Sequence, residues 1–456
     1  MKSDVTFIIL GASGDLAKKK LLPAIYHLVQ KGKVKNFGII GVAFNVYSAE
    51  ELFERSREYI KNVDNKLFNK IKKRFHYFQA DFNDEEKICN LGFFVRQIES
   101  KYKLKGNRMF YLSTLPSNYK AIIDNLTKCS LTDEKKNWAR VVFEKPFGDN
   151  LNDAKEINKC IHKAFDEEQI YRIDHYLGKE LVQNISVVRF TNIFFEPIWN
   201  KDFIEEVQFI MSEEYGVENR GKFYDNYGAV KDVFQNHMLQ LLALTTMESP
   251  SKFTSEDIRD NKVKVLKKVR VDKKKVLGQY QGYTKEKGIK KNSKTETFAA
   301  LRMFVDNKRW RDVPFNFITG KKMKDKITSI VIKFKNTNCN MFSQCNFNPN
   351  NLTIQIQPNE GFYMALNAKV PDSNKIQSVK MDFCHECTFG PNTPEAYENL
   401  LYDVIKGDHS AFIRNDEIEE QWKITEKITK TKLYSYKKGT YPKEADKMTN
   451  WHLNLN

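Results

Sequence analysis

The ten residues from Tyr171 to Glu180 read YRIDHYLGKE and bring hydrogen-bond donors and charged groups together around one glycine. His175 lies between an aspartate and a tyrosine, and Lys179 follows it by four residues. A histidine, a phenol and an ammonium group are donors of the kind that bind an anion. The segment is therefore a candidate anion-binding site.

A second candidate site follows the first apolar run of the chain. The run TFIIL leads into GASGDLAKKK, in which Gly11 and Gly14 bracket a tight turn from a strand into a helix. Backbone N–H groups at the start of such a helix can bind a pyrophosphate, and glycine leaves room for it. The full G-x-G-x-x-G pattern is absent, so an ordinary tight turn is the alternative. The residues that would contact a dinucleotide here are Gly11, Ala12, Ser13, Gly14, Asp15 and Leu16.

Five short apolar runs in the first third of the chain are each followed by helical spacing. Strands that alternate with helices predict a parallel, doubly wound sheet, in which the loops after the strands share one edge. The glycine turn leads this series, which favours dinucleotide binding over an ordinary turn. The predicted strands cover residues 6–11, 36–44, 75–81, 108–114 and 139–146.

The pattern changes after Asp174. An amphipathic segment at 234–247 is followed by strand-like runs without helices between them, which predicts an antiparallel sheet. The chain of 456 residues exceeds the ~250–300 at which a single core stops growing. We expect an N-terminal α/β, Rossmann-like domain at 1–171, and a larger α+β domain with a mainly antiparallel sheet at 172–456.

The chain is strongly basic, with 75 Lys and Arg against 58 Asp and Glu, so the net charge is +17. A nucleic acid, a membrane surface or a phosphorylated small molecule would each suit this charge. The lysine-rich segment 262–294 is interpreted as an exposed surface rather than a nucleic-acid-binding arm. No apolar run approaches the ~20 residues of a membrane span, so we expect no membrane partner.

The cysteines and the N-terminal sequence favour a cytoplasmic protein. Seven cysteines without regular spacing predict reduced thiols rather than a disulfide framework. Cys384 and Cys387 form one C-x-x-C, but a zinc site normally needs a second pair, so no metal is expected. The first residues run directly into a strand pattern and lack the features of a signal peptide.

With these motifs in view, the chain resembles the glucose-6-phosphate dehydrogenase family. The resemblance implies oxidation of glucose 6-phosphate at C1 to the lactone, with hydride transfer to a nicotinamide, at the entry to the pentose phosphate pathway. It also implies a large antiparallel sheet that forms the contact of a homodimer, or of a dimer of dimers. The matching segments are GASGDLAKKK, EKPFG (144–148), RIDHYLGKE (172–180), NRGKFYDNYGAVKDVFQNHMLQ (219–240), QPNE (357–360) and PKEADKM (442–448).

Removing the hydroxyl proton during hydride transfer requires a base, and a neutral histidine suits that role. His237 in KDVFQNHMLQ matches the family's base. Asp232 precedes it by five residues, and on an α-helix that spacing turns the side chain about 140° away. The resemblance instead supplies Asp174 as the carboxylate partner of the base, and it places Asp232 at the sugar.

The resemblance also assigns the remaining substrate contacts. Donors from the opening motif would surround the phosphate: His175, Tyr176 and Lys179. Because adjacent side chains of an extended segment point opposite ways, Asp174 could face the base while His175 faces the phosphate. Lys145 would contact both sugar and cofactor, and Pro146 follows it where a cis peptide bond is plausible. The other predicted sugar contacts are Glu213, Asp232, Lys321, Lys326 and Gln357.

The end of the second predicted strand normally distinguishes the two nicotinamide cofactors. Phe44 stands where the family commonly has an arginine for the 2′-phosphate, and no acid replaces it. We expect NADP, with Ser13, Asn45 and nearby lysines as the groups that would bind the phosphate, and keep an NAD-preferring enzyme as the alternative. Some family members bind a second, structural NADP through basic residues. No such site is expected here, because those positions are Ile327, Val331, Gln355 and Ala365.

Two other interpretations are weaker. A basic nucleic-acid-binding protein would account for the net charge, but it would leave the pairing of histidine and aspartate unexplained. An inactive regulator with the same fold would not need the full set of catalytic groups, all of which are present.

Overall fold

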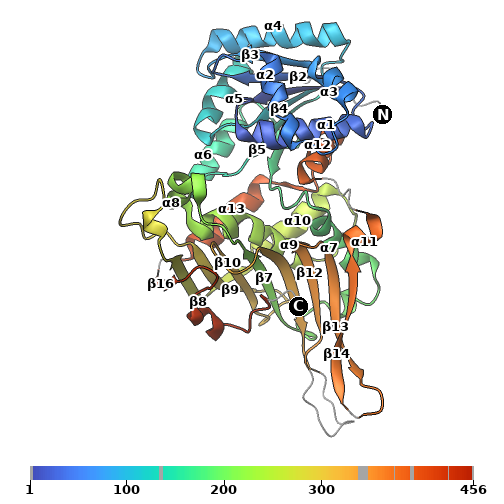
Figure 1. Ribbon diagram of the computed structural model, residues 1–456, viewed down its shortest axis with the longest axis vertical. Coiled ribbons are helices and arrows are strands. Elements are labelled where there is room, and N and C mark those ends of the chain that lie inside the picture. Colours follow the sequence, from blue (N-terminus) through green and yellow to red (C-terminus); the bar gives the residue numbers. More distant parts are fainter. Residues whose placement is uncertain are drawn as a thin grey trace. The chain divides into compact units, whose positions relative to one another are not determined.

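The computed structural model describes residues 4–132, 137–336, 348–373, 375–390, 395–429 and 431–453 (Figure 1). The chain forms two compact units. The first comprises Met1–Gly178, Thr254–Arg259 and Pro394–Glu419, and the second Lys179–Phe253, Asp260–Thr393 and Glu420–Asn456. Within the described ranges, no helix has both the length and the apolar character that crossing a membrane requires.

The first unit contains a seven-stranded sheet in the order β15-β6-β5-β4-β1-β2-β3. All neighbouring strands are parallel except β15, which pairs antiparallel with β6. The five predicted strands and their parallel pairing are confirmed. The strands are β1 (Asp4–Leu10), β2 (Asn36–Ala43), β3 (Phe75–Gln79), β4 (Arg108–Leu112), β5 (Ala139–Glu144), β6 (Ile170–Ile173) and β15 (Phe412–Ile413).

Strand β1 is buried on both faces, as a central parallel strand must be. Ile8 and Leu10 pack in a core cluster with apolar residues of α4 and α5, while Phe7 and Ile9 point to the opposite face and are also buried. The helical segments of this unit are η1 (Ala17–Leu21), α1 (Leu22–Gln30), α2 (Ala49–Glu54), η2 (Arg57–Tyr59), α3 (Asn65–Lys72), α4 (Glu85–Tyr102), η3 (Pro116–Asn118), α5 (Tyr119–Lys128), α6 (Leu151–Ile161), η4 (Glu167–Gln169) and α12 (Ala396–Lys406).

The second unit contains a nine-stranded sheet in the order β14-β13-β12-β11-β7-β10-β9-β8-β16. Its pairs are antiparallel except β7 with β10 and β8 with β16, which confirms the predicted sheet type. The strands are β7 (Ile204–Ser212), β8 (Val269–Tyr280), β9 (Phe298–Val305), β10 (Phe315–Gly320), β11 (Ile327–Phe334), β12 (Asn351–Gln357), β13 (Gly361–Lys369), β14 (Ile376–Cys384) and β16 (Leu433–Tyr436).

Helices α7 and α9 pack together in this unit, and α7 also lies against β12 (Figure 1). The helical segments are α7 (Glu180–Thr191), η5 (Glu196–Ile198), η6 (Glu218–Arg220), α8 (Gly221–Ala229), η7 (Val230–Met238), α9 (Leu239–Thr246), η8 (Tyr283–Lys285), α11 (His385–Phe389) and η9 (Lys443–Lys447). Two further helices, α10 (Ser255–Leu266) and α13 (Asn415–Glu426), contain the residues at which the two units are divided.

The interpretation of the lysine-rich segment 262–294 as an exposed surface is wrong in part. Strand β8 occupies much of it and pairs with β9 on one side and β16 on the other. Lys262 is completely buried, and its Nζ donates a hydrogen bond to Oε1 of Gln240 at 3.0 Å. The number of lysines in a segment predicts its charge. It does not predict which of its side chains become buried when the segment packs in the fold.

The prediction of reduced thiols is also wrong for four of the described cysteines. Cys89 on α4 is bonded to Cys129, which directly follows α5, across 40 positions of sequence. Cys384 and Cys387 of the C-x-x-C are bonded to each other at the start of α11. Cys160 is a free thiol. Helix packing brings the first pair together, which spacing along the sequence could not reveal.

Candidate active site

The glycine turn lies where the strand order of the parallel sheet reverses, between β2 and β4. The N–H groups of Gly11 and Ala12 both donate to the carbonyl of Val42, at 2.8 and 3.1 Å, and Gly14 N–H donates to the Gly11 carbonyl at 3.1 Å. Gly11 has a φ of +97°, and a Cβ there would lie 2.3 Å from the Ser113 carbonyl oxygen. The backbone is thus held close to both neighbouring strands, at the place where such sheets bind dinucleotides.

The other predicted cofactor residues surround this turn. Ser13 lies half-buried in the turn. Asp15, which is exposed, and Leu16, which is half-buried, already have helical backbone, and the helical segment η1 follows at Ala17. Phe44 and Asn45 follow the end of β2, and the Phe44 side chain is 67% exposed. The predicted cofactor residues therefore lie at the turn, at the start of the helix and at the end of β2, which are the places where sheets of this kind bind a dinucleotide.

The segment after β6 is a turn, which corrects the argument from an extended backbone. The carboxylate of Asp174 accepts the N–H of Tyr176 at 2.9 Å, and its carbonyl accepts the N–H of Leu177 at the same distance. Asp174 is buried, whereas His175 and Tyr176 are partly exposed and their rings lie 4.8 Å apart. The turn, rather than strand alternation, sets the directions of these side chains.

The glycine of the motif permits this turn to pack closely. A Cβ on Gly178 would lie 2.7 Å from Cγ of Leu400 and 2.8 Å from the Ala396 carbonyl oxygen, both on α12. Arg172 does not join the anion-binding group, because it is buried and forms an ion pair with Glu167 at 2.6 Å. Its place in the motif is structural.

Glu144 is a candidate residue that the sequence did not reveal. It ends β5 directly before Lys145, and its carboxylate accepts hydrogen bonds from the hydroxyls of Tyr111 at 2.5 Å and Tyr397 at 3.0 Å. Burial raises the pKa of Glu144 to about 7, against the lowering effects of those hydrogen bonds and of the Lys145 charge, and the Asp174 charge raises it further. Tyr397 lies more than 250 positions downstream, so no local pattern predicts the group.

Lys145 and Asp174 occupy equivalent places at the same sheet edge. Glu144 pairs with Ile173 in the parallel register of β5 and β6, so the residues that follow them leave the sheet side by side. The Lys145–Pro146 peptide bond is cis, as the sequence allowed. This edge also carries the glycine turn, because all six parallel strands end on it.

In the second unit, Glu213 and Lys321 meet at one edge of the large sheet. Their strands β7 and β10 are parallel neighbours in which Ser212 pairs with Gly320, so both residues follow directly after paired strand ends. The Lys321 ammonium group forms an ion pair with the Glu213 carboxylate. It also lies over the Tyr224 ring, 4.9 Å from the centroid. The Lys321 side chain is 10% exposed and is therefore held within the protein, whereas the Glu213 side chain is 47% exposed and reaches solvent.

Lys326 and Gln357 lie at the same edge. Lys326 directly precedes β11, whose first residue Ile327 pairs with Ser212. Gln357 ends β12 and pairs with Thr328, the second residue of β11. The four predicted sugar contacts thus lie at neighbouring strand ends on the same side of the sheet, because the registers of β10 with β7, of β7 with β11 and of β11 with β12 align these ends.

Lys179 lies within electrostatic range of the turn that follows β12. It directly precedes α7, and its charge lowers the pKa of Glu360, although burial of that carboxyl has the larger, raising effect. Glu360 is three residues beyond Gln357. Lys179 therefore belongs to the same neighbourhood of the second unit as the predicted sugar contacts.

The helical-angle argument that separated Asp232 from His237 does not hold. Residues Val230–Met238 form a π-helix, η7, rather than an α-helix. A π-helix bonds residues five apart, so positions 232 and 237 lie on the same side of it. Both side chains are buried, and Asp232 forms an ion pair with Arg220 at 3.5 Å. The resemblance implies Asp174 as the partner of His237, whereas the π-helix places Asp232 on the same side as the histidine.

We predict that Glu144→Gln makes stability less dependent on pH. The pKa of Glu144 is raised from 4.5 to about 7, so its stabilising contribution is complete below about pH 4.5 and is lost as pH rises through about 7. The free energy of unfolding of the wild type should therefore fall by about 2–3 kcal/mol relative to the variant between pH 4.5 and 8. Denaturant unfolding at both pH values measures this difference, and parallel pH profiles would contradict it.

Known proteins match nearly the whole length of this chain. Residues 8–184 match the family model described as glucose-6-phosphate dehydrogenase, NAD binding domain, and residues 186–454 match the model for the C-terminal domain of the same enzyme. Glucose-6-phosphate 1-dehydrogenase of Bacillus subtilis is 40% identical over 466 residues, covering 96% of this chain and 95% of the relative.

Solved structures agree. A glucose-6-phosphate dehydrogenase in complex with its substrate glucose 6-phosphate superposes with a TM-score of 0.90 at 34% identity, covering 96% of this chain and 95% of the other. Glucose-6-phosphate 1-dehydrogenase from Mycobacterium avium gives a TM-score of 0.89 at 33% identity, with complete coverage of both chains. With both family models matched and relatives similar over nearly its full length, the chain belongs to the glucose-6-phosphate dehydrogenase family.

Proposed function

We propose that this protein oxidises glucose 6-phosphate at C1 to 6-phosphoglucono-lactone and transfers the hydride to NADP, as the first step of the oxidative pentose phosphate pathway. The proposal is supported above all by one observation. The predicted sugar contacts Glu213, Lys321, Lys326 and Gln357 converge on one sheet edge, although they are far apart in the sequence. Family membership supplies the reaction.

His237 acts as the general base in this proposal. When bound, the nicotinamide accepts the hydride from C1, and His237 takes the proton of the C1 hydroxyl at the same stage. His237 is only 3% exposed, so the imidazolium that forms needs a carboxylate partner to stabilise it. We assign that role to Asp174, which also holds the imidazole in the tautomer that can accept the proton.

The substrate is held by groups with two different tasks. His175, Tyr176 and Lys179 bind the phosphate dianion through charge-assisted hydrogen bonds. The Glu213–Lys321 pair offers a carboxylate and an ammonium group to sugar hydroxyls, because an acceptor and a donor on neighbouring strand ends suit a hydroxyl that both donates and accepts. The other sugar contacts are Lys145, Asp232, Lys326 and Gln357.

The protein works as a homodimer or as a dimer of dimers in this proposal, with neither nucleic acid nor a membrane as partner. The active nucleotide is NADP, bound at the residues of the glycine turn, at Asn45 and at Lys145. The electrostatic case for NADP is that the end of β2 carries no acid that would repel a 2′-phosphate. An enzyme of the same fold that prefers NAD is the second candidate, favoured by the exposed Phe44.

His237→Asn should lower kcat for glucose 6-phosphate by several orders of magnitude and leave KM nearly unchanged, because asparagine cannot accept the proton but keeps much of the shape. Steady-state kinetics at saturating cofactor give both constants. Activity close to that of the wild type would show that His237 is not the base.

The carboxylate partner can be identified by comparing Asp174→Asn with Asp232→Asn. Substitution of the partner of the base should lower kcat, although by less than His237→Asn does. Substitution of a sugar contact should mainly raise KM. We expect the kcat effect at Asp174 and the KM effect at Asp232. Double variants with His237→Asn provide the control, because loss of the true partner should have little further effect once the base is absent. The reverse pattern would assign the partner to Asp232 on the π-helix.

Cofactor preference should appear as a higher kcat/KM with NADP than with NAD. The measurement is initial-rate formation of reduced nicotinamide with each nucleotide at saturating glucose 6-phosphate. A strong preference for NAD would overturn the choice of NADP while leaving the sugar-phosphate oxidation intact.

One nucleotide should bind per chain. Ile327 and Val331 are almost fully buried apolar residues and Gln355 is a buried amide, so these positions supply no positive charge for a second nucleotide. Calorimetric titration with NADP should give a stoichiometry of one. A stoichiometry of two nucleotides per chain would contradict the prediction that the second unit binds none.

A further inference from the structure

A 2′-phosphate requires a cation near the end of β2, and Phe44 cannot supply it. We propose that Arg55, assisted by Lys18, binds the 2′-phosphate of NADP in place of an arginine at position 44. This inference rests on the proposed use of NADP. It names the residues that would distinguish NADP from NAD in this chain.

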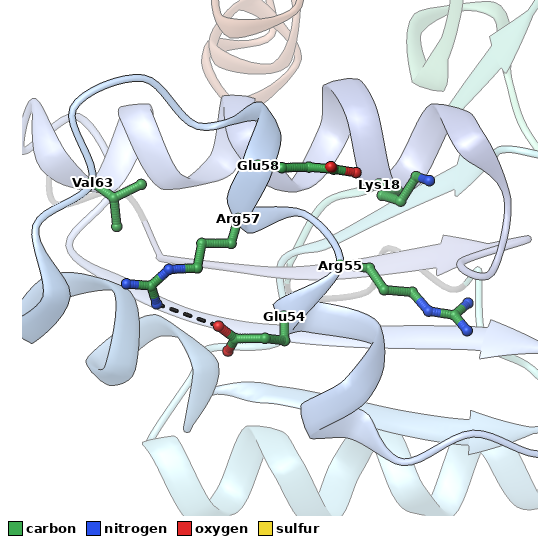
Figure 2. Close-up of a pocket in the computed structure, with 6 residues that line it drawn as sticks. All are labelled: Lys18, Glu54, Arg55, Arg57, Glu58 and Val63. Atoms are coloured by element: carbon green, nitrogen blue, oxygen red, sulfur yellow. Dashed lines mark hydrogen bonds and ion pairs between the residues drawn. The ribbon is translucent and has the colours of Figure 1, made fainter.

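Both residues line one cleft of the first unit. The cleft has a volume of about 650 Å³ and is bordered by Lys18, Glu54, Arg55, Arg57, Glu58 and Val63 (Figure 2). The side chains of Lys18 and Arg55 extend in the same direction, whereas Arg57 points the opposite way (Figure 2). Lys18 lies four residues beyond Gly14 and Arg55 directly follows α2, so the two cations lie on segments that follow the ends of β1 and β2.

Arg55 is positioned by an aromatic ring from the loop after β2. Its guanidinium group lies over the Tyr47 ring, 4.5 Å from the centroid. Tyr47 in turn packs edge-on against Tyr77, whose hydroxyl donates to the carbonyl of Ala43 at 3.0 Å. This chain of contacts ties Arg55 to the last residue of β2. A cation held beside the strand end is where a 2′-phosphate would be recognised.

The partners that Arg55 now has do not prevent phosphate binding. Its ion pair with Glu51 at 2.9 Å joins two exposed side chains, and such pairs contribute little stability. A phosphate dianion accepts paired hydrogen bonds from a guanidinium group and is the stronger partner. Glu51 can therefore be displaced when the nucleotide binds.

The residues that line the cleft include three cations, Lys18, Arg55 and Arg57, and two acids, Glu54 and Glu58. Lys18 lies over the Tyr59 ring at 5.4 Å and 3.5 Å from the Asp15 carboxylate. Among the acids of the cleft, Glu54 is already neutralised by Arg57 and by Lys72, each at 3.3 Å. Glu58 lines the same cleft and opposes an anion, and the three cations that line the cleft offset its charge.

Phe44 fits this arrangement as a contact for the adenine ring of the nucleotide rather than for its 2′-phosphate. Its ring is 67% exposed at the end of β2, and an exposed aromatic face is suited to stacking against adenine. Adenine is common to NADP and NAD, so this contact gives affinity without preference. Preference must then come from the cations of the cleft.

The test is calorimetric binding of NADP, NAD and adenosine 2′,5′-bisphosphate to the full chain and to two variants. Arg55→Gln should weaken binding of NADP and of the bisphosphate by about ten-fold or more, and should change the affinity for NAD by less than about two-fold. Arg57→Gln is the matched control, because it removes a cation of the same cleft that points away from Lys18. Lys72 still pairs with Glu54 in that variant, so all three affinities should change by less than about two-fold. Thermal unfolding of both variants verifies that they are folded.

Each outcome separates this inference from the proposed function. Equal loss of affinity for NADP and NAD in Arg55→Gln, or no loss for either, would overturn the role of Arg55. A wild type that binds NADP no more tightly than NAD would also overturn it, even if glucose 6-phosphate is oxidised. Failure of the wild type to oxidise glucose 6-phosphate with either nucleotide would refute the proposed function, whatever the binding data give.

Discussion

The turn that begins at Asp174 is the constraint on which the candidate site depends. The aspartate carboxylate accepts the N–H of Tyr176, and Gly178 lets the turn pack against α12 without a clash. The same few residues carry the proposed partner of the base and the proposed phosphate ligands, and the chain passes into the second unit directly after Gly178. In the proposed mechanism, a small shift of this backbone would therefore affect proton transfer and substrate anchoring together.

The architecture of both units could be predicted from the sequence because it depends on repeated local patterns. Strands β1 to β5 are short, mainly apolar runs separated by amphipathic helices, and a parallel sheet is the common fold for that alternation. The late segments of the first unit were not predictable in this way. Strand β15 has only two residues, and α12 joins the unit through packing rather than through any periodicity.

The residues of the candidate site could be predicted where the sequence matches motifs of the family. They could not be predicted where the backbone is neither an ordinary α-helix nor an extended strand. The angle between two side chains can be calculated from their spacing only when the type of helix is known. Segment η7 is a π-helix, and no residue type in it predicts this. Strand alternation likewise failed at His175, because the aspartate before it makes a turn with its own side chain. Glu144 and the Cys89–Cys129 bond are absent from the prediction since each joins elements that meet only after folding.

Direct hydride transfer from C1 of glucose 6-phosphate to the nicotinamide is the central claim, and isotopic labelling tests it most directly. Glucose 6-phosphate deuterated at C1 is incubated with the protein and NADP, and the reduced nucleotide is analysed by NMR. The account predicts one deuterium on the nicotinamide ring for each lactone formed, together with a slower reaction than with the unlabelled sugar. Reduced nucleotide without deuterium, or no reduced nucleotide, would contradict it.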